Sequence, residues 1–180
     1  MLGNRGVLMA VTRRMANGSG ALFCAGCMGY ALFAQHVLGL EPCPLCILQR
    51  VAMIALGLAF FVAFLHDPGR LGARIYGVLI FLVAAIGGSV SARHFRLQNL
   101  PPDQVPDCGP GLDYMLSSFP LGETLKMVLS GSGECAKIVW SFLGFSMPAW
   151  VFACFVFLGV AGFLANQHLG KAKTAQLAGA

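Results

Sequence analysis

Of the 180 residues, 57% are hydrophobic and only 11% are charged, and the formal net charge is +5. Soluble domains carry charge on about a quarter of their residues, so this composition argues against a soluble domain and indicates a membrane protein. Lys and Arg are too thinly spread to predict nucleic-acid binding, and we expect a lipid bilayer to surround the chain.

Four apolar stretches are each close to the length of about 20 residues that a helix needs to cross the hydrocarbon core. We place them at about 21–40, 45–65, 71–90 and 148–164. The first is longer than the apolar core of about 7–15 residues in a signal peptide, so we expect it to stay uncleaved. The sequence therefore predicts an all-α membrane protein, a single integral-membrane domain over 1–180 built as a four-transmembrane-helix bundle.

The connections between these stretches differ in length and polarity. The first two loops are short, whereas a long polar segment over about 91–147 is rich in Pro, Gly, Asp and Ser. Basic residues gather on the side that holds both termini and the 66–74 loop, against one acid, Asp67. Because Lys and Arg favour the cytoplasmic side, we expect both termini to be cytoplasmic and the other two loops to face outward. The basic residues are Arg5, Arg13, Arg14, Arg70, Arg74, Lys171 and Lys173.

This orientation divides the seven cysteines into groups. Two pairs face the oxidising side of the membrane, where disulfides persist. The three cysteines inside predicted spans are expected to be small packing residues. The short outward loop holds Cys43 and Cys46, the long one holds Cys108 and Cys135, and the spans hold Cys24, Cys27 and Cys154.

The spacing of the first four cysteines also fits a zinc ribbon, but the predicted helix excludes it. Fifteen residues lie between Cys27 and Cys43 along an apolar helical stretch, and the sixteen helical steps from one to the other place them roughly 24 Å apart. A structural zinc ion needs all four sulfurs within about 2.3 Å. The sequence therefore predicts no metal site.

The Cys43–Cys46 pair has the features of a reactive dithiol. Cys46 lies at the N-terminal end of the second span, where the helix dipole stabilises a thiolate. Arg50 is one turn deeper on the same face, and it can stabilise that thiolate and donate hydrogen bonds to an oxygen-bearing ligand. The alternative is a structural clip, but a clip across two residues stabilises little. The polar residues Gln35, His36, Arg93 and His94 lie at similar depth and favour a site for an amphipathic head group.

Glycines flank both cysteines of the long loop, so their backbone is expected to be loose. Between them, Leu121, Leu125 and Val128 or Leu129 recur at helical spacing. This pattern predicts a short interfacial helix on the membrane surface.

Together these residues resemble the DsbB family of bacterial disulfide bond formation proteins, over about 29–150. Cys24, Cys27 and Cys154 depart from the family pattern, as does Gln49, where some relatives carry an acid. The stretches that carry the resemblance are Gln35-His36, Pro42-Cys43-Pro44-Leu45-Cys46 with Arg50, Arg93-His94 with Gln98, Cys108, Gly133-Glu134-Cys135, Phe142-Leu143-Gly144 and Met147-Pro148-Ala149-Trp150.

The resemblance implies a thiol:quinone oxidoreductase of the bacterial inner membrane. Such a protein reoxidises a periplasmic DsbA-like thioredoxin-fold oxidant and passes the electrons to ubiquinone or menaquinone. It further implies that Cys108 forms the mixed disulfide with the partner and that Cys135 links back to Cys43. Cys46 is then the thiolate that reacts with the quinone.

The same resemblance implies that Arg50 is the main quinone contact, with His94 and Gln35 as further contacts. One alternative is an enzyme similar to the vitamin K epoxide reductase family, which would place its principal Cys-x-x-Cys in a late helix. The other is a four-span structural or transport subunit with two structural disulfides, which would bind no quinone.

Overall fold

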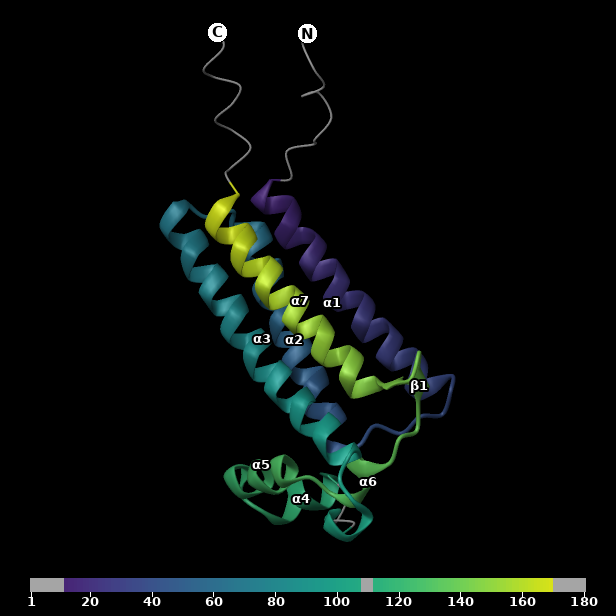
Figure 1. Cartoon of the computed structure of the whole chain (residues 1–180). Coiled ribbons are helices and arrows are strands. Elements are labelled where there is room, and N and C mark those ends of the chain that lie inside the picture. Colours follow the sequence, from purple (N-terminus) through teal and green to yellow (C-terminus); the bar gives the residue numbers. More distant parts are fainter. Residues whose placement is uncertain (1–11, 108–111, 170–180) are drawn as a thin grey trace, which may run out of the picture.

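Four long helices dominate the computed structural model, which describes residues 12–107 and 112–169. They are α1 (Arg13–His36), α2 (Pro44–His66), α3 (Arg70–Gln98) and α7 (Met147–His168). The four lie side by side, with α3 packed on α7, α1 on α2, and α2 on α3 (Figure 1). The start of α1, the α2–α3 turn and the end of α7 share one end of this bundle, and the long loop covers the other.

Three helices within the described ranges are long and apolar enough to cross a membrane: α2, α3 and α7. The chain is therefore a helical membrane protein. Helix α1 has 24 residues but is more polar, with Arg13, Arg14 and Asn17 in its first turns and Gln35 near its end.

The long loop folds into short elements at one end of the bundle. These are η1 (Pro102–Gln104), α4 (Leu112–Ser118), α5 (Leu121–Ser130), α6 (Gly133–Ala136), β1 (Ser141–Phe142) and β2 (Phe145–Ser146). The two strands form an antiparallel hairpin, which the sequence pattern did not predict. Its two central residues, Leu143 and Gly144, have φ of 51° and 80°, as the tightest hairpin turns require.

Small residues allow the long helices to approach closely, as is common in membrane bundles. A Cβ atom on Gly87 of α3 would lie 2.4 Å from the ring of Phe155 on α7. A Cβ atom on Gly162 of α7 would lie 2.7 Å from both Phe60 and Ile80. The core between α2, α3 and α7 is thus built by aromatic and aliphatic side chains inserted against glycines.

Polar contacts join α1 to its neighbours. The buried amides of Asn17 and Asn166 donate to each other at 3.2 and 2.9 Å, which links α1 to α7. Arg13 forms an ion pair with Asp67 at 3.1 Å and also donates to the carbonyl of Pro68. The first turns of α1 are therefore fixed to the ends of both α2 and α7.

Candidate redox site at the start of α2

The Cys43–Cys46 pair builds the first turn of α2. Cys43 is the N-cap residue, and its sulfur accepts a hydrogen bond from the Cys46 backbone N–H at 3.4 Å. Pro44 occupies the first helical position, where its missing N–H is not needed. The two sulfurs are 3.0 Å apart, with the Cys43 thiol donating to Cys46, and both thiols are free. A disulfide requires about 2.05 Å between sulfurs, so the sulfurs need to approach by only about 1 Å when an acceptor removes two electrons and two protons from the pair.

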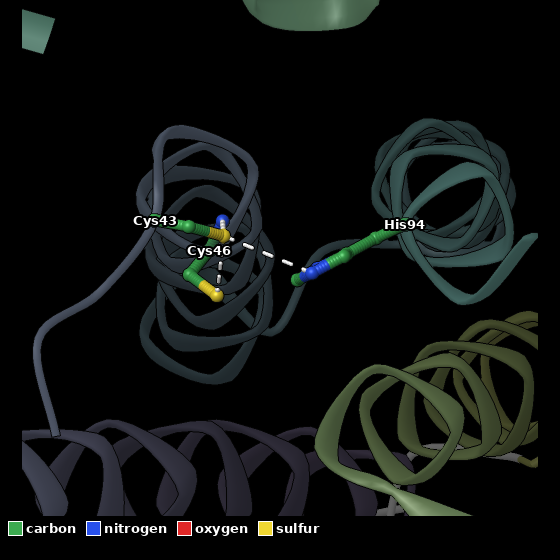
Figure 2. Close-up of side chains that lie close together, drawn as sticks. All are labelled: Cys43, Cys46 and His94. Carbon is green, nitrogen blue, oxygen red and sulfur yellow. Dashed lines mark hydrogen bonds between the residues drawn. The ribbon is translucent and has the colours of Figure 1, made fainter. Parts of the chain in front are cut away.

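His94 of α3 points at this pair from the neighbouring helix (Figure 2). Its Nε2 lies 3.7 Å from the sulfur of Cys43 and 3.1 Å from the carbonyl oxygen of Cys135. Its Nδ1 lies 3.1 Å from the side-chain nitrogen of Gln49 on α2. Because the Gln49 amide donates to Nδ1, Nε2 carries the ring proton and donates to Cys135. His94 thus connects α2, α3 and α6 at one point.

Cys135 lies in the four-residue helix α6, and its side chain is only 1% exposed. A hydrogen bond with Cys43, followed by burial, raises the pKa of the Cys135 thiol. The Gly133 backbone N–H donates to the carbonyl of Asp107 at 3.2 Å, so the chain just before Cys108 lies beside α6. Cys108 itself lies outside the described residues.

A cavity of about 100 Å³, open to the surroundings, lies between α1, α2 and the start of α7. Its walls are mainly apolar. The polar lining groups are the thiols of Cys27 and Cys46, the amide of Gln49, the carboxylate of Glu41 and one cationic group, Arg50. Arg50 is held in place by α1, because it donates to the Gln35 side chain and to the Ala31 carbonyl, the latter at 3.1 Å.

Six of the seven predicted site residues gather at this end of the bundle. The seventh, Cys108, lies outside the described residues. His94 and Gln35 do not line the cavity, but each contacts a residue that does, Gln49 and Arg50 respectively. Gln49 had no predicted role, although an amide inside an apolar span is itself a signal of a polar partner.

Arg93 also lies away from the cavity. Its guanidinium donates to the carbonyl oxygens of Leu129 and Ser130, the latter at 3.1 Å. It therefore fixes the C-terminal end of α5 to α3. The C-terminal end of α3 holds the long loop through this residue and through His94.

These features define a class: a helical membrane protein with a reduced dithiol at a helix N-terminus, beside an apolar cavity and within reach of a third thiol. The sequence profile described as "Disulfide bond formation protein DsbB" matches residues 13–165. The chain therefore belongs to the DsbB family.

Curated relatives agree with this assignment, and each is named disulfide bond formation protein B. The one from Methylococcus capsulatus is 54% identical over 145 residues, which is 81% of this chain and 88% of the relative. Those from Nitrosococcus oceani and Chromobacterium violaceum are 53% and 56% identical, over 78% and 73% of this chain and 83% and 79% of their own lengths. The chain is thus a membrane oxidoreductase of disulfide bond formation, and a structural or transport subunit is not favoured.

Proposed function

We propose that this protein carries electrons from a periplasmic DsbA-like dithiol protein, through Cys108–Cys135 and then Cys43–Cys46, to a membrane quinone. One observation carries the proposal. Cys46 lines an apolar cavity together with Arg50, while Cys43 in the same helical turn packs against the buried cluster that contains Cys135 and lies 3.7 Å from His94, which contacts the Cys135 carbonyl. The Cys43–Cys46 pair can therefore exchange electrons with a lipid-soluble acceptor through Cys46 and with the long loop through Cys43.

The relay begins in the long loop, and each exchange moves two electrons by thiolate attack on a disulfide. A thiolate of the reduced partner attacks Cys108 and displaces Cys135, and the partner's second thiol then releases the oxidised partner. The long-loop dithiol next reduces the Cys43–Cys46 disulfide through a mixed disulfide between Cys135 and Cys43. Attack of Cys108 on Cys135 restores the loop disulfide and leaves Cys43 and Cys46 reduced.

The surroundings of Cys46 favour its thiolate over that of Cys43. The Cys46 sulfur accepts a hydrogen bond from the Cys43 thiol, lies in the first turn of α2, and precedes Arg50 by one turn. A helix N-terminus and a nearby cation both stabilise thiolates. Cys46 is therefore the sulfur placed to face the acceptor, and Cys43 the one placed to face Cys135.

The cavity fits a quinone because its walls are apolar while its cationic group can donate hydrogen bonds to a carbonyl oxygen. A bound ubiquinone or menaquinone would accept two electrons and two protons. Arg50 is its proposed polar contact, and Gln35 and the Ala31 carbonyl orient Arg50. His94 accepts a hydrogen bond from Gln49, which lines the cavity, and donates one to the Cys135 carbonyl in the long loop. It would therefore position both groups without contacting the quinone itself.

In the proposed topology α1 also spans the bacterial inner membrane, with both termini in the cytoplasm. The end of the bundle where α1 starts carries Arg13, Arg14, Arg70 and Arg74, and its acid, Asp67, is paired with Arg13. This excess of positive charge supports a cytoplasmic position.

We further propose that α5 lies on the periplasmic surface of the inner membrane. Thr124 and Val128 pack inward, whereas Leu121 and Leu125 are 77% and 48% exposed. An exposed apolar stripe on a short amphipathic helix suits the lipid interface. Arg93 would fix this helix, and the loop it carries, close to the bundle.

A trapping experiment tests the relay. In cells that express Cys135→Ser, the Cys108 thiolate can attack the disulfide of the oxidised thioredoxin-fold partner and displace one of its thiols. The covalent complex between Cys108 and the partner should accumulate, because the resolving thiol of Cys135 is absent. The double variant Cys135→Ser with Cys108→Ser is the matched control and should trap nothing. A complex that persists in the double variant, or that maps to Cys43, would contradict the proposed order.

A further inference from the structure

Three donor atoms converge where the reduced dithiol meets α3. The sulfurs of Cys43 and Cys46 and a ring nitrogen of His94 all lie within 4.8 Å of one another (Figure 2). Within residues 12–107 and 112–169, this is the one group of three or more His, Cys, Asp or Glu side chains that is so close. Cys24, Cys27 and Cys154 do not form such a group.

The separations are near those of a tetrahedral zinc site. Zn–S bonds of about 2.3 Å and Zn–N bonds of about 2.0 Å place neighbouring ligand atoms roughly 3.3–3.8 Å apart. The Cys43 sulfur already lies 3.7 Å from Nε2 of His94. The two sulfurs, at 3.0 Å, need to separate by less than about 1 Å.

The surroundings supply what a zinc site needs beyond its ligands. Histidine ligands are usually oriented by a hydrogen bond to the second ring nitrogen, and Gln49 makes that contact here. When the Gln49 amide turns over, its oxygen accepts from Nδ1–H and leaves the Nε2 lone pair for the ion. Two thiolates neutralise the charge of Zn²⁺, so the buried site carries no net charge. Thiolate and imidazole donors also exclude Mg²⁺ and Ca²⁺, which prefer oxygen.

We propose that the reduced protein binds one Zn²⁺ through Cys43 Sγ, Cys46 Sγ and His94 Nε2, and that this binding halts reoxidation. Each thiol gives one proton to solvent on binding, and no oxidation state changes. The bound sulfurs can then neither form their disulfide nor attack another one. His94 simultaneously releases the Cys135 carbonyl, so α6 loses this hydrogen bond to α3, while Arg93 still holds the end of α5. A fourth position remains for water or for the nearby Cys135 thiol.

The binding experiment needs neither quinone nor partner, whereas the effect on turnover rests on the proposed function. Full-length protein without an affinity tag is reduced, kept anaerobic in lipid nanodiscs, and titrated with Zn²⁺ against a chromogenic chelator. Co²⁺ is titrated in parallel, because its thiolate charge-transfer and d–d absorption report sulfur ligands and tetrahedral geometry. We expect one ion per chain in the reduced protein and none after the Cys43–Cys46 disulfide has formed.

Variants assign the ligands. Cys43→Ser and His94→Ala should abolish the Co²⁺ spectrum, and Gln49→Leu should weaken binding about 10- to 100-fold. The controls His36→Ala and Cys27→Ser should bind as the parent does. Equal binding by the oxidised protein would overturn the site, and this measurement uses the parent chain, so it does not depend on how well a variant folds. An unchanged Co²⁺ spectrum in His94→Ala would also overturn the site, because a poorly folded variant would lose the spectrum rather than keep it.

A final arm separates the site from its consequence. Zn²⁺ at the measured dissociation constant should halve quinone reduction by reduced protein, and a chelator should restore it. If the ion binds while quinone reduction continues unchanged, the inhibitory role is wrong. If the protein reduces no quinone even without Zn²⁺, the proposed function fails, while the binding measurement still decides the site.

Discussion

Replacing Arg50 separates quinone binding from thiol exchange. The guanidinium donates to Gln35 and Ala31 on α1 and is the one cationic group that lines the cavity. If it donates one hydrogen bond to a quinone carbonyl, Arg50→Ala removes a charge-assisted bond of about 1.5–3 kcal/mol. This loss lowers kcat/KM for quinone about 10- to 150-fold. Arg50→Lys should recover only part, because an ammonium lacks the planar fork that also reaches α1.

The assay is steady-state quinone reduction by purified protein in nanodiscs, with a reduced thioredoxin-fold dithiol as electron donor. Arg96→Ala is the matched control, since Arg96 is exposed on α3 away from the cavity, and its kinetics should match the parent's. Exchange between the donor and the long-loop disulfide, measured without quinone, should be unchanged in Arg50→Ala. An unaltered KM for quinone in Arg50→Ala would refute the assignment of Arg50 to the quinone site.

Three further predictions follow from single contacts. His94→Ala removes the donor to the Cys135 carbonyl, so electron transfer from the long-loop pair to the short-loop pair should slow about 5- to 30-fold, equivalent to about 1–2 kcal/mol. Rapid-quench trapping measures this rate, and an unchanged rate would exclude the positioning role of His94. Asn166→Leu leaves its partner amide on α1 buried and unpaired, which should reduce stability in denaturant titrations by about 1–3 kcal/mol, and equal stability would show that this link is dispensable. Cysteines introduced beside Arg70 should resist an impermeant thiol reagent in intact cells while ones beside Asp103 react, and the opposite pattern would reverse the topology.

Much of the candidate site could be predicted because its residues are close in the sequence. Pro44 and the helix start place the two thiols in one turn, and Arg50 follows Cys46 at the spacing of one turn. Local rules of helix capping and periodicity describe such an arrangement well. The resemblance to the family rested on this stretch together with others over about 29–150, among them those around the long-loop cysteines, and the comparisons confirm the family.

Contacts between distant parts of the chain were the features that local rules could not supply. Gln49 lies 45 residues from His94, and Asn17 lies 149 residues from Asn166. Hydrophobic periodicity gives the face of a helix but not which helix that face meets. The polar side chains within apolar stretches did indicate that partners exist, but naming them required the packing of α2 on α3 and of α1 on α7.

The role of His94 shows the same limit in chemical terms. Its depth favoured a place among the quinone contacts, whereas the structure directs its ring to Cys43 and to the Cys135 carbonyl. A residue at the right depth can face either of two neighbouring sites. The side of α3 that meets α7 is set further along the helix, where Gly77 lies against Asn166 and Gly87 against Phe155.

The most direct test of the account is the stoichiometry of quinone reduction by the reduced protein alone. Anaerobic protein in nanodiscs is mixed with excess ubiquinone, and quinol and remaining thiols are counted. The variant in which Cys24, Cys27, Cys108, Cys135 and Cys154 are all replaced by alanine should still form one quinol per chain, with loss of both remaining thiols. Adding Cys46→Ser should abolish quinol formation. Quinol formed without Cys46, or none formed by Cys43 and Cys46 alone, would contradict the central claim that this pair passes electrons to the quinone.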